Sequence, residues 1–156
     1  MTADGLDSGQ RDQIARLEAA NAAFYRAVEG GDLDTLAELW VGEEHGDTAL
    51  CVHPGWPALR GREELLRSFA IIMANTPYIQ FFLTDLSVQV VGELAVVNCV
   101  ENMLTSVGAE QGDPDEEAGL GGGQAVATNV FRQVEGGWRL WLHHASPVLA
   151  PPEEGE

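Results

Sequence analysis

The stretch CVHPGW, residues 51–56, places a histidine at the end of an apolar run and a tryptophan three residues later. An imidazole titrates near neutral pH, so His53 is suited to accept or donate a proton at the mouth of a pocket. The alternative is a strand-end histidine hydrogen-bonded to the backbone. The aromatic residues expected to line this pocket, or to belong to the ordinary core, are Tyr25, Trp56, Phe69 and Phe81.

A carboxylate interrupts a second apolar run, AVVNCVENML. Glu101 shares its face of the run with Val97, Cys99 and Met103, so the side chain is expected to be buried. Burial raises the pKa of a carboxyl group or requires a partner, and either is common at working sites. The alternative is an ion pair with an arginine, such as Arg132 or Arg139.

A second histidine candidate lies in the last apolar run, WRLWLHHAS. Alternation places His144 on the same face as Leu140 and Leu142, which predicts that it faces the cavity. A core histidine satisfied by a neighbour is the alternative. His53, His144 and Glu101 would also suit a two-histidine, one-carboxylate metal site. Nothing in their spacing is diagnostic of a metal, and we predict none.

Three helices are expected to hold these residues. Apolar residues recur every three or four positions in three segments, which are 10–29, 33–40 and 62–74, and Asp32 can cap the second. Gly30-Gly31 ends the first helix, and Pro77 prevents extension of the third.

Strands account for most of the remaining sequence. They are expected at 48–53, 78–91, 94–107, 124–134 and 138–146, with PALR as a brief return strand. The face of the strand 78–91 changes near Thr84-Asp85, which predicts a bulge and a sharp bend. Residues 108–123 show no periodicity and are expected to form a long flexible loop. This order predicts an α+β domain, with a strongly curved antiparallel sheet wrapped around the helices and a pocket at its open end.

The composition limits the partners. The chain carries 25 acidic against 8 basic residues, for a formal charge of −17. Such a chain repels phosphate groups, so nucleic acid and membranes are not expected as partners. The absence of an export signal and of a long apolar run predicts a cytoplasmic protein. No motif for a nucleotide or another organic cofactor is present, and we expect none.

Four segments resemble a known superfamily. They are FYRAVEGGDLDTLAELW, HPGWPALRGREELL, LTDLSVQVVGELAVV and NVFRQVEGGWRLWLHHAS, and they run from about Phe24 to Pro147. Together they resemble the nuclear transport factor 2-like superfamily and, within it, the SnoaL-like group. The resemblance implies a cone-shaped curved sheet with a central cavity, commonly dimerised through the outer sheet face. It implies no single activity, because the superfamily includes both enzymes and binding modules.

Comparison with ketosteroid isomerases, which belong to this superfamily, suggests roles for individual residues. His53-Pro54 stands where those enzymes carry a general base. Asn129 occupies the position of the aspartate that helps to form the oxyanion hole in those enzymes. Its side-chain amide can also donate a hydrogen bond to a developing oxyanion. The helix position that carries a tyrosine donor in the isomerases is Phe24 here, and the adjacent Tyr25 is expected to point elsewhere. The steroid isomerase site is therefore incomplete.

Residues 10–148 are expected to form one domain, between a flexible N-terminus (1–9) and an acidic tail (149–156). We expect a small apolar organic ligand in the pocket. One hypothesis is an isomerase, cyclase, dehydratase or hydrolase with His53 as general base, assisted by Asn129, His144 and Glu101. The other is a ligand-binding or interaction module without turnover.

The final strands are apolar on both faces. Val130 and Trp141 are expected to point away from the cavity, where exposed apolar surface marks an interface. A two-fold homodimer that joins sheet to sheet is the simplest way to cover such a patch.

Overall fold

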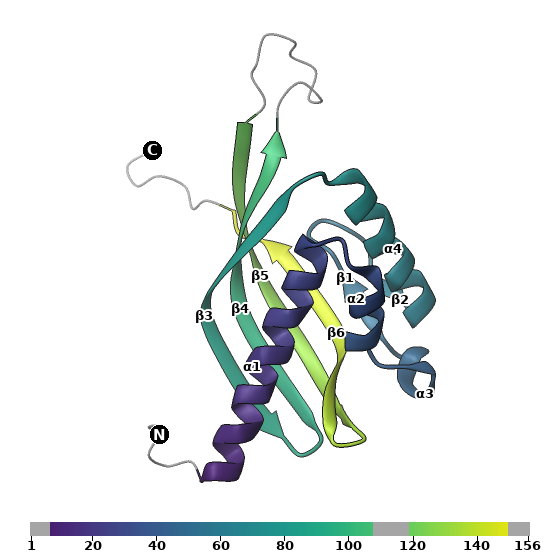
Figure 1. Cartoon of the computed structure of the whole chain (residues 1–156), viewed down its shortest axis with the longest axis vertical. Coiled ribbons are helices and arrows are strands. Elements are labelled where there is room, and N and C mark those ends of the chain that lie inside the picture. The colour runs from purple at the N-terminus through teal and green to yellow at the C-terminus, as the bar shows by residue number, and fades with distance from the viewer. Residues whose placement is uncertain (1–6, 108–118, 150–156) are drawn as a thin grey trace.

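The structure is a computed structural model that describes residues 7–107 and 119–149. Figure 1 shows α1 lying along one face of a twisted sheet, with α2 and α4 beside its C-terminal half. The helices are α1 (Ser8–Glu29), α2 (Leu33–Leu39), α3 (Glu43–Gly46) and α4 (Arg62–Asn75). The strands are β1 (Leu50–Val52), β2 (Leu59–Arg60), β3 (Ile79–Val91), β4 (Leu94–Val107), β5 (Gly119–Val134) and β6 (Gly137–Pro147).

A capping box starts the long helix. The Asp7 carboxylate accepts from the Gln10 backbone N–H, while the Gln10 side chain accepts from the Asp7 N–H. The helix therefore begins two residues before the position expected from its apolar period. Its buried face includes Leu17, Phe24 and Val28, which pack on the sheet.

The six strands form one sheet in the order β2-β1-β6-β5-β4-β3. Neighbours are antiparallel except for β1 and β6, which are parallel. The expected purely antiparallel sheet is thus a mixed sheet. No hairpin joins β1 to β6, so no turn requires them to run in opposite directions.

A bulge interrupts β3 where the change of face predicted it. Thr84 pairs with Val100 and Ser87 with Asn98, so two residues of β3 lie opposite Cys99 alone. Asp85, in the bulge, adopts φ of 55°. The additional residue restores the inward face, on which Val88 and Val90 pack against the core.

A second bulge, in β6, was not predicted. Val130 pairs with Leu142 and Phe131 with Leu140, which leaves Trp141 as the additional residue. Before it, Trp138 and Leu140 face inward; after it, His143 and Ala145 do. The bulge thus reverses the faces of the two adjacent histidines.

Several sequence expectations fall partly outside the described residues. These are the flexible N-terminus for 1–6, the long loop for 108–118 and the acidic tail for 150–156. The loop was expected to extend to residue 123, which is wrong, because residues 119–123 pair with β4 as part of β5. No helix among the described residues is long and apolar enough to cross a membrane.

Candidate active site

A tight turn fixes the position of His53 at the end of β1. The Trp56 N–H donates to the His53 carbonyl at 2.9 Å, and Gly55 between them has φ of 81°. Proline at the second position and a glycine with positive φ at the third suit a type II turn. The turn brings the Trp56 ring to 4.9 Å from the His53 ring, centroid to centroid.

The hydrogen bonds of His53 define which ring nitrogen carries its proton. Its Nε2 lies 2.9 Å from Ser68 Oγ, and Ser68 donates its own proton to the Leu65 carbonyl. Ser68 must therefore accept from His53, so Nε2 is protonated and Nδ1 keeps its lone pair. Burial lowers the pKa of His53 to about 4, so the ring is neutral at pH 7.

A tyrosine and a carboxylate form a buried pair between α1 and β4. The Tyr25 hydroxyl donates to Glu101 Oε2 at 2.5 Å, and Glu101 is only 3% exposed. Burial raises the pKa of Glu101 to about 6, and the bond from Tyr25 opposes part of that rise. Glu101 is thus buried as the sequence predicted, but its partner is a hydroxyl group and not an arginine.

An asparagine connects this pair to a second histidine. Asn129 donates to Asn21 Oδ1 at 2.8 Å and to the Tyr25 hydroxyl at 3.2 Å. Its Oδ1 lies 2.6 Å from His143 Nδ1 and must accept from it, which leaves His143 Nε2 with a lone pair. Burial, followed by the nearby His53 and His144, lowers the pKa of His143 to about 3.

His53, Tyr25, Glu101 and His143 line a pocket of about 300 Å³, which we call the His53 pocket. It is mainly apolar, with a few polar groups, as is usual for small-molecule sites. Seven of the predicted site residues line it: Phe24, Tyr25, His53, Trp56, Phe69, Phe81 and Glu101. The remaining lining residues are Val28, Pro54, Ile72, Ile79, Met103 and His143.

Two predicted catalytic residues lie elsewhere. Asn129 is fully buried and does not line the pocket; it contacts Tyr25 and His143 from behind the pocket wall. His144 is exposed on the outer sheet face, beside Val126 and Thr128, so the prediction that it faces the cavity is wrong. The bulge at Trp141 is the reason. The set of His53, His144 and Glu101 is therefore not assembled around one point.

Tyr25 lines the pocket as expected, but the expectation from helix geometry that it points away from the direction of Phe24 is wrong. Phe24 and Tyr25 both line the pocket, because the end of α1 lies between the sheet and α4 and is covered on two sides. His143, which sequence reasoning missed, takes the place expected of His144. The adjacent pair His143-His144 was the available signal, since one of two successive strand residues must face inward.

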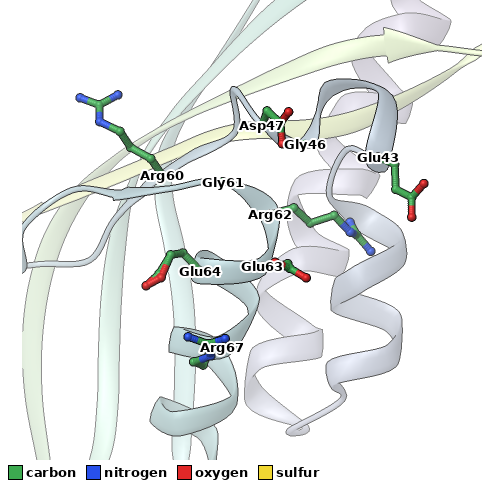
Figure 2. A pocket seen from close by; sticks show the side chains of 9 residues that line it. All are labelled: Glu43, Gly46, Asp47, Arg60, Gly61, Arg62, Glu63, Glu64 and Arg67. Atoms are coloured by element: carbon green, nitrogen blue, oxygen red, sulfur yellow. The ribbon is translucent and has the colours of Figure 1, made fainter.

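A larger hollow, of about 790 Å³, lies at the start of α4, away from these residues. Figure 2 shows Arg60, Arg62 and Arg67 around it, interleaved with Glu43, Asp47, Glu63 and Glu64. The Arg62 guanidinium is already bound to the Val41 carbonyl at 2.7 Å. Opposite charges alternate here, so the hollow favours neither sign of ligand.

Solved structures similar to this chain share its fold. A "putative dehydratase" of the nuclear transport factor 2-like family from Streptomyces avermitilis is 50% identical, with TM-score 0.80, over 90% of this chain and 99% of that one. A "putative calcium/calmodulin-dependent protein kinase type II association domain" from Thiobacillus denitrificans is 26% identical, with TM-score 0.68, over 85% and 94%. A "putative scytalone dehydratase" from Novosphingobium aromaticivorans shares the fold at 11% identity, with TM-score 0.72, over 94% and 91%.

The search of curated proteins found no match to this chain. The sequence model of the SnoaL-like domain matches residues 17–151, which is most of the chain. Together with the cone-shaped α+β architecture, this match identifies the family. The chain belongs to the SnoaL-like domain family of the nuclear transport factor 2-like superfamily.

Proposed function

We propose that this protein removes water from a small, mostly apolar hydroxy compound, with His53 transferring the proton. The observation that carries the proposal is the arrangement of His53 at the pocket. Ser68 accepts the Nε2–H of His53, so Nδ1 has a lone pair, and the Cys51 thiol lies 3.9 Å from Nδ1. The 50% identical protein named as a "putative dehydratase" supports this reaction class.

The proposed reaction uses one histidine as base and then as acid. His53 Nδ1 accepts the proton of a C–H bond next to a carbonyl group, the C–O bond to the hydroxyl group breaks, and a C=C bond forms. The imidazolium then donates the same proton to the leaving hydroxyl, which departs as water. Its pKa of about 4 keeps the base neutral at pH 7 and makes the imidazolium a ready acid.

An isomerase that forms a full enolate is less well supported. Such a site needs donors that point at the developing oxyanion. The Tyr25 hydroxyl instead donates to Glu101, and the Asn129 amide donates to Asn21 and to the Tyr25 hydroxyl. A concerted elimination builds less charge on the carbonyl oxygen and depends less on those donors.

A binding module without turnover is the second candidate. The low pKa of His53 makes it a weak base, and the 26% identical protein is named as an association domain. In this case the same pocket binds a small apolar ligand and releases it unchanged.

Turnover of a β-hydroxy ketone tests the proposal. With 4-hydroxy-4-phenylbutan-2-one as the probe, we expect absorbance of the conjugated product to rise with the wild type and not with His53→Gln. His144→Gln is the matched control, because His144 lies on the outer face, and it should retain the activity. The rate should decrease as pH falls through about 4, where His53 becomes protonated.

The accompanying binding measurement separates the two candidates. A ligand that binds the native state raises the melting temperature. If compounds raise it in the wild type and not in His53→Ala, yet a panel of β-hydroxy ketones gives no product, the protein is a binding module and the dehydratase proposal is overturned.

A further inference from the structure

The polar groups of the His53 pocket are almost all hydrogen-bond acceptors. The Tyr25 and Ser68 protons and the His53 Nε2–H are all donated to protein partners. What remains is the lone pair of His53 Nδ1, that of His143 Nε2 and the second oxygen of Glu101. Among the described lining residues, the other side-chain N–H groups are that of His143 Nδ1, which is donated to Asn129, and the indole of Trp56, which is 40% exposed.

The Glu101 carboxylate has no cationic partner in this pocket. None of the described lining residues is an arginine, and the chain contains no lysine. Two of the arginines contact other groups: Arg139 binds the Glu38 carbonyl and Arg132 lies over Trp141. A buried carboxylate held by one hydroxyl group is stabilised by any cation that enters.

Aromatic rings surround the same space. Phe24, Phe69, Phe81 and Trp56 line the pocket together with Tyr25. The face of an aromatic ring attracts a cation, and the attraction increases where water is excluded. A carboxylate, two imidazole lone pairs and several aromatic rings therefore meet at one cavity.

We propose that the His53 pocket binds a small apolar ligand that carries a protonated amine, with its ammonium group against Glu101. The N–H donors of an ammonium group match the acceptors of Glu101 and His143, which leaves His53 Nδ1 for the proton transfer. The inference deepens the proposed function, because it names the charge of the substrate for the same pocket. It also holds for a binding module, since it requires no turnover.

Three probes with one skeleton test this charge preference. Titration calorimetry at pH 7.5 compares 2-phenylethylamine, 2-phenylethanol and phenylacetate with the full chain. We expect the amine to bind at least about ten-fold more tightly than the alcohol, because a charge-assisted hydrogen bond contributes that much affinity. Phenylacetate should bind most weakly, because Glu101 repels it.

The variant Glu101→Gln keeps the shape and the acceptor for Tyr25 but removes the charge. It should bind the amine and the alcohol with similar affinity, and its melting curve verifies that it is folded. Glu64→Gln is the matched control, because it removes one exposed charge outside the pocket. It should retain the preference of the wild type.

The pH dependence gives an independent readout. Amine binding should weaken as pH falls through about 6, where Glu101 becomes protonated, and level off near the affinity of the alcohol. The other ionisable groups near Glu101 are Tyr25 on α1, Cys99 on β4, Cys51 and His53 by β1, and His143 on β6. The tyrosine and the thiols, with raised pKa values, stay neutral, and the histidines titrate only near 4 and 3.

The results of the two experiments are distinguishable. If the alcohol binds the wild type as tightly as the amine, or if Glu101→Gln retains the preference, the amine proposal is overturned. The dehydratase proposal stands or falls separately, on product formation from the uncharged hydroxy ketone. Product formation without a preference for the amine would therefore refute the amine proposal and support the dehydratase proposal.

Discussion

Glu101 illustrates what a single buried charge costs the fold. Its carboxyl group is almost completely enclosed, and one hydroxyl group supports it. Its pKa is about 6 in the folded chain and 4.5 for the ordinary group. Because the folded state holds the proton more tightly, ionisation of Glu101 opposes folding as pH rises from 4.5 to 6.

Replacement of this one residue should therefore stabilise the protein at neutral pH. We expect Glu101→Gln to raise the free energy of unfolding by up to about 2 kcal/mol at pH 8. The difference should vanish below about pH 4.5, where the native carboxyl group is protonated in both states. Urea unfolding of both proteins at the two pH values measures it. A difference that does not change with pH would contradict this account.

At the scale of the element, the bulges decide what each strand presents to the pocket. The β3 bulge holds Asp85 at φ of 55°, a left-handed conformation that is costly for most residues. Aspartate tolerates it better than branched residues do, and glycine adopts it freely. The bulge bends an edge strand that carries Phe81 to the pocket.

Substitutions at Asp85 should therefore separate backbone strain from side-chain contacts. We expect Asp85→Val to destabilise the fold by about 1–2 kcal/mol and Asp85→Gly to leave it nearly unchanged. Thermal unfolding monitored by circular dichroism measures both. Equal effects of valine and glycine would show that the left-handed conformation is not what the position requires.

At the scale of the whole molecule, the outer sheet face carries exposed apolar side chains. A shallow hollow of about 360 Å³ there is lined by Val126, Thr128, Leu142, His144 and Ser146. Trp141 is half-buried within the single chain, where its indole donates to Thr48 Oγ1 at 2.8 Å. Val126 is 38% exposed, so apolar surface persists on this face.

We expect this face to join two copies of the chain. Val126→Arg should convert a dimer into a single species of 16.8 kDa, because a buried, unpaired guanidinium opposes the contact. Val91→Arg is the control, since Val91 is 70% exposed beside the hairpin at the end of β3. Sedimentation at micromolar concentration measures both. A wild-type protein that sediments at the one-chain mass would refute the dimer.

The sequence by itself determined the elements, because local signals specify them. The period of three to four residues predicted the long helices, and alternation predicted the inward face of β4, with Glu101 buried on it. The shift of face at Thr84-Asp85 predicted the first bulge. His53 at the pocket followed from its place at the end of an apolar strand.

Only the tertiary structure decided which neighbours these residues meet. The bulge at Trp141 leaves no mark in WRLWLHH, whose alternation stays regular, so the inward histidine was assigned as His144 when it is His143. Tyr25 lies between a sheet and a helix, so a prediction that follows one helix face could not place it at Glu101. The proton positions on His53 and His143 depend on Ser68 and Asn129, which are distant from them in the chain. A histidine becomes an acceptor or a donor through such partners, and packing alone brings them together.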